Sequence, residues 1–518
     1  MATEHTETER KYDGATDRPL SAAELPRVAR LRAGGTLKLD AVYYDTPQLH
    51  LLRRGITLRR RTGGHDAGWH LKTPGPDDSR TEARLPLAAG DLRHPPAELV
   101  ARTRADARGE PVAPVAHLRT RRDLTNLVDE KDRTLAELAR DTVSAELLGG
   151  GARRDGGPAP ARAVTWVETE VELAAGGPGL IEEVEAQLLR RGLHRSASGS
   201  KLGRALAGRL AAGDGSDTPD VRDTSEAAGT GATPGSVGAA LTAYLRTQYA
   251  ALRALDAAVR LDEPDAVHRM RVAVRRLRSA LAAHRRLLDR TATDRLDREL
   301  RRLGKVLGRA RDAEVLAERL GRQAAQLPPA GHPAAVGAAI RDWFDARYRA
   351  AHRDAVRAMD GRRYFALLDD LERFVSSPPL NGRAERGRSE ARRMLRRQRR
   401  RTTHRLGDAL ALAPGARRDR ELHRARKAAK RARYAAESVS VLVERPAIRT
   451  TRRMKKVQKP LGAHQDGVMG EQALAELAAA PAQRGKAAFG LGILYARQRA
   501  DARRHVEKAA KAHRRLTT

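Results

Sequence analysis

The sequence predicts an α+β protein with two parts, an N-terminal part built from antiparallel strands and a C-terminal part built from helices. Up to about residue 210, short segments alternate polar and apolar side chains with a period of two, which is typical of half-buried strands. From residue 237 onward the segments are long, amphipathic and rich in Ala, Leu and Arg. Charge divides the chain in the same way. Residues 1–236 carry 35 basic and 35 acidic side chains, so the whole formal excess of +35 falls on residues 237–518.

The N-terminal strands are separated by turn sequences. ITLRRR, GWHLKTP and VTWVETEVEL alternate, whereas TPGPDD and GGGARRDGGPAP are Pro/Gly-rich breaks. Residues 180–211 have a helical pattern that closes this domain, which we place at residues 1–211. Residues 212–236 contain Gly, Ser, Thr, Pro and Asp and little that can be buried, which predicts a flexible linker before a helical domain at 237–518.

The helical part contains an internal repeat. VHRMRVAVRRLRS (267–279) aligns with LHRARKAAKRARY (422–434), and RRLGKVLGRARD (301–312) aligns with KKVQKPLGAHQD (455–466). The two pairs of blocks keep register to within one residue, and breaks at QLPPAGHP, SSPPLNG and LAPGA separate the helices. We expect two pseudo-symmetric helical bundles, at about 237–375 and 390–518.

Each repeat places a column of cations on one helix face, opposite an apolar face. At 3.6 residues per turn, the cations of residues 267–279 lie on one face of their helix, and their counterparts in residues 422–434 occupy the equivalent positions. The second pair of blocks adds one lysine to each repeat. Such a column repels itself unless it is solvated or an anion lies along it, and its repetition in register favours the anion. The candidate polyanion-binding residues are His268, Arg271, Arg275, Arg278, Lys305, His423, Arg426, Lys430, Arg433 and Lys459.

The nature of the polyanion follows from the few aromatic residues. Proteins that bind single-stranded nucleic acid interleave cations with rings that stack on bases, and here the basic helices offer only Tyr434. A phosphate polymer without bases fits best, while non-specific binding of duplex DNA stays open. The run from Arg386 to Arg405 has ten Arg and one Glu, and we expect it to form a solvated or loosely ordered surface.

Composition excludes several classes of site. The absence of cysteine excludes disulfides, thiolate-bound zinc, iron–sulfur clusters and a cysteine nucleophile. No run approaches the 18 apolar residues of a membrane span, so no membrane partner is expected. The charged start MATEHTETERK has no apolar segment of a secretory signal, and a cytoplasmic protein is therefore expected.

The predicted strands carry rows of both charge signs. Glu7, Glu9 and Lys11 alternate in ETERK, so on a strand they project to one face, where neighbouring carboxylates are commonly held together by Mg2+. Arg59 and Arg61 likewise share a face. Either these faces are solvated, or the sheet closes into a barrel that holds a metal and a phosphate chain.

Six segments taken in order carry a family resemblance: ETERK, YYDTPQLHLLRRGITLRRR, GWHLKTP, RTEARLPL, WVETEVEL and SKLGRAL. Residues 1–210 resemble a CYTH domain of the triphosphate tunnel metalloenzymes. Residues 237–518 resemble a CHAD domain, a helical polyphosphate-binding module. The resemblance implies an eight-stranded antiparallel tunnel with flanking helices, followed by an all-α domain with pseudo-two-fold symmetry.

The resemblance also implies roles for individual side chains. The carboxylates on the metal side, for Mg2+ or Mn2+, are Glu7, Glu9, Asp141, Glu168 and Glu170. The cations that hold the phosphate chain are Lys11, Arg59, Arg61, Lys72, Arg121 and Lys201. Glu82 is a further metal-side or water-positioning carboxylate, and Glu172 is a rim or structural residue. Arg121 is preferred to Arg122 because T-R after an alternating segment fits the strand register.

The expected function is therefore metal-dependent hydrolysis of inorganic triphosphate, or a related triphosphate, by an inorganic triphosphatase whose helical domain binds inorganic polyphosphate. Class IV adenylyl cyclases share the tunnel, but the sequence has no distinctive nucleoside pocket. One alternative is a non-catalytic polyphosphate-binding protein associated with polyphosphate granules. Another is a basic protein that binds nucleic acid without specificity.

Overall fold

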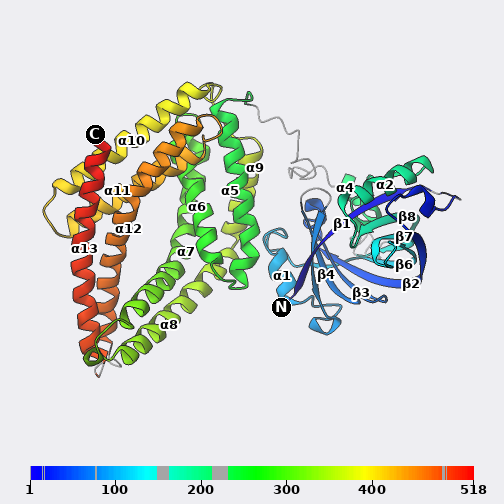
Figure 1. Cartoon of the computed structure of the whole chain (residues 1–518), viewed down its shortest axis with the longest axis horizontal. Helices are drawn as coiled ribbons and strands as arrows, with labels where there is room; N and C mark the ends of the chain where they lie inside the picture. Colours follow the sequence, from blue (N-terminus) through cyan, green and yellow to red (C-terminus); the bar gives the residue numbers. More distant parts are fainter. Residues whose placement is uncertain are drawn as a thin grey trace, which may run out of the picture. The chain divides into compact units, whose positions relative to one another are not determined.

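The computed structural model describes residues 2–14, 16, 18–75, 79–148, 163–212, 232–480, 485 and 487–517. Its contacts divide the chain into two compact units, Met1–Ala227 and Ala228–Thr518, and each unit has its own hydrophobic clusters (Figure 1). Most of the predicted linker at 212–236 and the predicted turn GGGARRDGGPAP lie outside the described residues.

The N-terminal unit is a closed antiparallel barrel of eight long strands, as predicted. They are β1 (Thr3–Asp13), β2 (Arg30–Asp45), β3 (Thr57–Thr62), β4 (Gly68–Pro74), β5 (Ser79–Leu85), β6 (Ala113–Val128), β7 (Thr134–Leu147) and β8 (Ala163–Leu173). Their order is β5-β4-β3-β2-β6-β7-β8-β1, with the two-residue β9 (His194–Arg195) beside β1. The barrel closes because the first half of β1 pairs with β5 and its second half pairs with β8.

Short helices cover and plug this barrel. They are α1 (Ala97–Thr103), α2 (Pro178–Arg190), α3 (Lys201–Ala205) and α4 (Ala207–Ala212), with 3-10 turns η1 (Ala22–Glu24), η2 (Leu52–Arg54) and η3 (Leu87–Ala89). The apolar side of α2 packs on the outer side chains Tyr12 and Val171. Leu202 of α3 packs instead against Val143 and Trp166, whose side chains face inward. One part of the interior is therefore an apolar core, and the rest is free for polar side chains.

The C-terminal unit is helical throughout its described residues. Its helices are α5 (Val237–Arg260), α6 (Ala266–Ala283), α7 (Arg290–Ala324), α8 (Pro333–Met359), α9 (Arg362–Ser376), α10 (Arg388–Ala411), α11 (Ala416–Glu437), α12 (Glu444–Ala479) and α13 (Ala487–Thr517), with the 3-10 turn η5 (Pro329–Gly331). The predicted Pro/Gly breaks fall between α7 and α8, α9 and α10, and α10 and α11. Within the part of the chain that is described, no helix is both long enough and apolar enough to cross a bilayer.

The two sequence repeats occupy equivalent places in this unit. The first pair of blocks lies on α6 and α11, which pack against each other, and the second pair lies on α7 and α12. α7 pairs with α8 and α12 with α13 as long hairpins (Figure 1), and apolar side chains join the ends of the hairpins. The predicted apolar faces are confirmed, since these side chains are all buried: Met270, Val274, Leu277, Leu281, Ala425, Ala429, Ala432 and Ala436.

Candidate functional site

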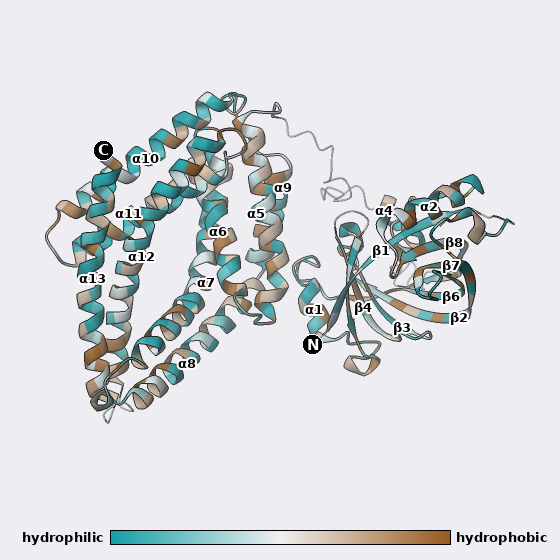
Figure 2. Cartoon of the chain, viewed as in Figure 1, coloured by the Kyte–Doolittle hydropathy of each residue, from teal (hydrophilic) through white to brown (hydrophobic). Residues whose placement is uncertain are grey.

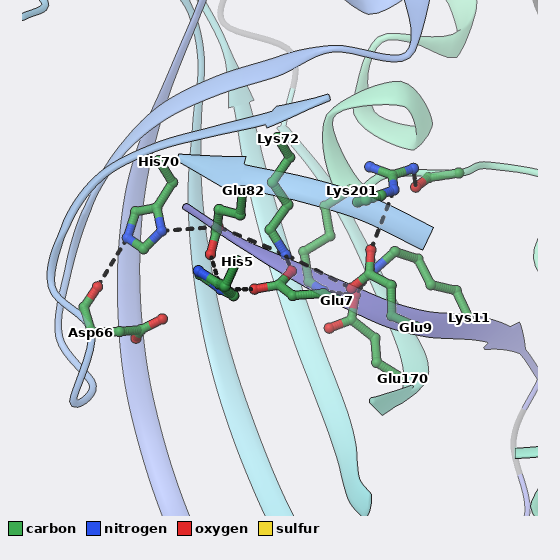
Figure 3. A network of polar contacts seen from close by, with 12 residues as sticks. His5, Glu7, Glu9, Lys11, Asp66, His70, Lys72, Glu82, Glu170 and Lys201 are labelled. Carbon is green, nitrogen blue, oxygen red and sulfur yellow. Dashed lines mark hydrogen bonds and ion pairs between the residues drawn. The ribbon is translucent and has the colours of Figure 1, made fainter. Parts of the chain in front are cut away.

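The polar part of the barrel interior is lined by charged side chains of both signs (Figure 3). Alternate residues of each strand point inward, and the strand register sets Lys11 opposite Glu170 and Lys72 opposite Glu82. Eleven of the predicted site residues are buried or half-buried in this unit, and ten of them lie on interior strand positions while Lys201 comes from α3. They are Glu7, Glu9, Lys11, Arg59, Arg61, Lys72, Glu82, Asp141, Glu168, Glu170 and Lys201.

Three carboxylates from β7 and β8 form one acidic group around a lysine. Asp141, Glu168 and Glu170 are almost completely buried. Lys201 Nζ lies 2.8 Å from Asp141 Oδ2, 2.8 Å from Glu168 Oε1 and 2.5 Å from Glu170 Oε1. Lys201 reaches this point because it opens α3, where the Ser200 hydroxyl accepts a hydrogen bond of 3.0 Å from the Gly203 amide and caps the helix.

This acidic group fits a divalent cation. Each of the three residues offers one oxygen, and these oxygens lie within 4.8 Å of one another. Carboxylate oxygens are the donors that Mg2+ and Mn2+ prefer, and burial shields them from competing water. Lys11 also contacts Glu170, so a second ammonium group stands beside the oxygens that a metal would take.

A second group of possible ligands surrounds Glu82, which is completely buried. His5 Nε2 lies 2.7 Å from Glu7 Oε1 and 3.1 Å from Glu82 Oε2, and His70 Nδ1 lies 3.0 Å from Glu82 Oε1. The other ring nitrogen of His70 lies 2.9 Å from the Asp66 carbonyl oxygen, which fixes the ring (Figure 3). Glu82 is therefore held in place by two imidazoles.

Neither histidine was selected by sequence reasoning. His5 stands two residues before Glu7, and His70 stands two residues before Lys72, so the same period of two that selected Glu7 and Lys72 also brings both rings inside. The strand alternation was thus the signal for both.

Three cations face the carboxylates from β3 and β4. Lys72 Nζ donates to Glu7 Oε2 at 2.5 Å and lies 3.8 Å from Glu82 Oε1. Arg59 donates to the Tyr43 hydroxyl at 3.3 Å, and Arg61 pairs with Asp66. These side chains are mostly buried, so their charges act in a medium where water screens them little.

The preference for Arg121 over Arg122 was wrong. Arg121 points away from the interior, with 67% of its side chain exposed, and lies 3.7 Å from Asp123. Arg122 Nη2 instead donates to Asp141 at 2.6 Å and to Glu170 at 2.5 Å. Leu118 points into the barrel, and alternate residues of a strand point to the same side, so Arg122 points inward as well. The preceding threonine, on which the choice of Arg121 was based, does not tell which side of the strand faces the interior.

The fields of these groups keep the carboxylates ionised. Burial by itself would raise the pKa of Glu9, but Lys11, Lys72 and Arg80 hold it well below its usual range. Burial also opposes the ionised form of Asp141, yet Lys201 and Arg122 hold its pKa low. At the edge of the group, burial and the nearby charge of Glu7 raise the pKa of Glu172 to about 6.

In the helical unit the basic faces of α6 and α11 meet. Arg271 donates to Asp312 at 2.9 Å, and Arg275 donates to the Tyr434 hydroxyl at 3.0 Å. Burial and the charges of Arg426, Arg275 and Arg271 lower the pKa of Lys430 to about 6. We call Arg271, Arg275, Arg426 and Lys430 the axial cluster. It combines two cations from each repeat.

Two repeat-equivalent glycines allow the arginines of the axial cluster to approach the neighbouring helices. A Cβ at Gly308 of α7 would lie 3.3 Å from Arg271 Nη2, and a Cβ at Gly462 of α12 would lie 3.6 Å from Arg426 Nε. Among the described residues, the buried Nε of Arg426 has no hydrogen-bond partner. The cluster therefore has donor capacity that the protein itself does not use.

The other predicted residues of the basic helices are placed differently. His268 and His423 are half-buried, and burial lowers the pKa of both, to about 4 for His423. Arg278 lies 2.9 Å from Asp297 and Arg433 lies 3.4 Å from Glu437. Two predicted lysines, Lys305 and Lys459, are exposed on α7 and α12.

Comparisons with known proteins agree with this architecture. The model of the CYTH domain matches residues 5–204, and the model of the CHAD domain matches residues 243–475. Uncharacterized proteins from two strains of Mycobacterium tuberculosis are 36% identical over 521 residues, which cover 99% of this chain and 96% of the relatives.

Solved structures of both kinds of domain are also similar. PptA from Streptomyces chartreusis is 23% identical, with 54% of this chain and 99% of that chain covered and a TM-score of 0.46. The CHAD domain from the plant Ricinus communis is 24% identical, with 56% and 97% covered and a TM-score of 0.43. A Hippeastrum adenylyl cyclase homologue with a dominant triphosphatase activity is 16% identical, with 39% and 96% covered and a TM-score of 0.22. The chain belongs to the CYTH–CHAD proteins, in which a triphosphate-tunnel domain is followed by a CHAD domain.

Proposed function

We propose that the barrel hydrolyses inorganic triphosphate, or a related triphosphate compound, with the help of a divalent cation, and that the helical unit binds inorganic polyphosphate. One observation carries the first half of the proposal: a buried interior with opposed rows of cations and ionised carboxylates. A triphosphate has too many negative charges to be buried unpaired. The interior supplies cations for its oxygens and carboxylates for a metal within the same small volume.

Asp141, Glu168 and Glu170 would hold Mg2+ or Mn2+, with Glu7 and Glu9 on the same interior surface. When bound, the ion supplies neutralisation of phosphate charge and polarises a phosphoryl oxygen. In its absence Lys201 and Arg122 neutralise these carboxylates, so the group is preorganised at little cost in repulsion.

The cations hold the phosphate chain. Arg59, Arg61 and Lys72 line one side of the polar interior, and Lys11 and Lys201 line the other. Guanidinium groups match two phosphate oxygens at once, whereas the lysines act as point charges that can move from a carboxylate to a phosphate. An arriving triphosphate therefore replaces ion pairs that already exist between protein groups.

Glu82 positions the attacking water. Burial opposes its charge, but the hydrogen bond from His70 and the charge of Lys72 keep the pKa of Glu82 far below neutral, so it stays ionised and accepts a hydrogen bond from water. The water oxygen attacks the terminal phosphorus while the bond to the bridging oxygen breaks. Phosphate and pyrophosphate result, and the proton of the water passes to the product phosphates.

The axial cluster supports the second half of the proposal. Its four cations lie close together, and the protonated form of Lys430 is destabilised by burial and by the charges of Arg426, Arg275 and Arg271, a repulsion that a bound polyanion relieves. Tyr434 is completely buried against Arg275, so it cannot stack on a base. This favours a phosphate polymer over single-stranded nucleic acid.

The test is phosphate release by the full-length protein from inorganic triphosphate, ATP and long polyphosphate, each with Mg2+, Mn2+ or EDTA. We expect chelator-sensitive release that is selective for triphosphate, lost in the double variant Glu7→Gln/Glu9→Gln, with polyphosphate binding retained by that variant. Polyphosphate binding without any release would contradict the catalytic half and leave a binding protein. Stronger binding of DNA than of polyphosphate at equal phosphate concentration would contradict the second half.

A further inference from the structure

Helix α10 carries a stripe of arginines. Of the two surfaces expected for Arg386 to Arg405, solvated or loosely ordered, the structure has a solvated one on a regular helix. Residues 388–411 are helical, and Arg393, Arg397, Arg401 and Arg405 follow one another at four-residue spacing along one side. Figure 2 shows α10 as hydrophilic over most of its length. Glu390 lies 3.2 Å from both Arg393 and Arg397, which neutralises the start of the stripe.

The second half of the stripe has no such neutralisation. Among the described residues neither Arg401 nor Arg405 has an acidic partner. Their charges act on Arg431 of α11, since burial and the charges of Arg401 and Arg405 lower the pKa of Arg431. α10 packs along α11, so these three arginines belong to neighbouring helices of one face.

The same surface continues onto α6 and α7. Burial and the charges of Arg278 and Arg301 lower the pKa of Lys427, which neighbours Arg431 by one helical turn on α11. Asp297 is shared by Arg278 at 2.9 Å and Arg301 at 3.0 Å. In the described part of the chain, Lys427 and Arg431 have no ion pair of their own.

We propose that this surface, the outer track of Arg278, Arg401, Arg405, Lys427 and Arg431, binds the continuation of a long polyphosphate chain that is held at the axial cluster. Lys427 joins the two sites, because it directly follows Arg426 of the axial cluster on α11. Affinity therefore rises with chain length until one chain occupies both. The inference rests on the proposed polyphosphate binding and specifies its ligand as long chains.

A flexible chain suits this path better than a duplex. The axial cluster is half-buried, whereas Arg401 on the outer track is exposed, so one ligand must pass from a recessed surface to an open one. Duplex DNA has a persistence length of about 50 nm and resists such a bend. α10 also contains no aromatic residue that could stack on an unpaired base.

The experiment measures binding of the full chain to tripolyphosphate and to short and long polyphosphate in EDTA, which prevents metal-dependent hydrolysis. The variant is Arg401→Gln/Arg405→Gln. The matched control is Arg392→Gln/Arg399→Gln, which removes the same charge from exposed positions on the other side of α10. Far-UV circular dichroism and thermal unfolding of both variants check that α10 still folds.

We expect the outer-track variant to bind long chains about fivefold more weakly, with a salt slope smaller by about one, and to bind tripolyphosphate as the unmodified protein does. The control is expected to keep the full dependence on chain length. Equal losses in both variants, or an unchanged length dependence in the first, would overturn the outer track while leaving the axial cluster intact. Absence of all polyphosphate binding by the unmodified protein would overturn the proposed function and this inference together. A loss confined to duplex DNA would reassign the surface to nucleic acid.

Discussion

His284 and Ser438 stand at the C-terminal ends of the two repeat-related basic helices, and their side chains contact each other. Each caps the C-terminal end of its basic helix, His284 on α6 and Ser438 on α11. His284 Nε2 lies 2.8 Å from Ser438 Oγ, and both residues are buried. The C-terminal ends of two repeat-related helices therefore meet in the core of the helical unit.

Replacement of Ser438 by Ala should destabilise the helical unit, because it leaves a buried imidazole nitrogen without a partner. We expect the free energy of unfolding to fall by about 1–3 kcal/mol, measured by urea denaturation. Ser440→Ala is the matched control, since its hydroxyl donates to the Glu437 carbonyl of the adjacent helical turn. Equal effects of the two substitutions would contradict a special role for the contact between His284 and Ser438.

Arg122 and Arg121 offer a comparison between adjacent residues. Arg122→Gln removes the bidentate contact with Asp141, so kcat/KM for triphosphate should fall by about 10². Arg121→Gln removes an exposed charge and should leave kcat/KM within about a factor of two. Steady-state kinetics of both variants measure the difference, and a larger loss in Arg121→Gln would reverse the interior assignment.

Glu82→Gln keeps the size of the side chain but removes the charge that orients water. We expect kcat for triphosphate hydrolysis to fall by about 10² or more while KM changes little. Glu172→Gln, at the edge of the carboxylates, serves as the control and should retain most activity. A rise in KM at unchanged kcat would mean that Glu82 contributes to binding instead of to the chemical step.

Charge reversal at the axial cluster should separate the two activities. Arg271→Glu/Arg426→Glu is expected to weaken polyphosphate binding at least tenfold and to flatten its dependence on salt, because fewer counterions are released. Hydrolysis of triphosphate should continue. Lys305→Glu/Lys459→Glu removes the same charge from exposed positions outside the cluster and should have a smaller effect. Equal loss of hydrolysis and binding would contradict two independent sites.

Polyphosphate binding should take up protons through Lys430. In the free protein its pKa is about 6, so the amine is mostly neutral at pH 7, and a bound polyanion raises this pKa. Affinity should therefore decrease as the pH rises from 6 to 8. Calorimetry in two buffers of different ionisation heat measures the proton uptake. Lys430→Met should abolish most of it, and uptake that persists in this variant would assign the proton elsewhere.

Much of the barrel was predictable because one face of each strand is buried. A strict period of two therefore fixes which side chains meet, and it selected Glu7, Glu9 and Lys11 correctly as an interior row. The period of two could not show whether Arg121 or Arg122 points inward, because both residues are charged. The answer depends on which apolar residues of the same strand are buried inside the barrel, and that is known only from the structure. The pairing of β1 with both β5 and β8 could not be predicted either, because it joins segments that are far apart in the sequence.

In the helical unit the repeat predicted equivalent helices but not their contact. The repeat predicted one cation column on each of two helices and did not say that the columns meet, whereas the structure packs α6 on α11 and brings Arg271 close to Arg426. The small alanines of α11, all completely buried at Ala425, Ala429 and Ala432, permit this close packing. Helical periodicity shows that a face of small residues is buried, but not which helix packs on it. The axial cluster therefore could not be deduced from the sequence.

The axial cluster brings together equivalent residues of the two repeats, Arg271 with Arg426 and Arg275 with Lys430, and this has a consequence for the direction of a bound chain. A site built from two copies of the same helix is nearly unchanged when it is turned by half a revolution, so it distinguishes poorly between the two ends of a ligand. Inorganic polyphosphate has identical ends and loses nothing in such a site. A nucleic acid strand runs from a 5′ end to a 3′ end, and only asymmetry between the repeats could make such a site read its polarity.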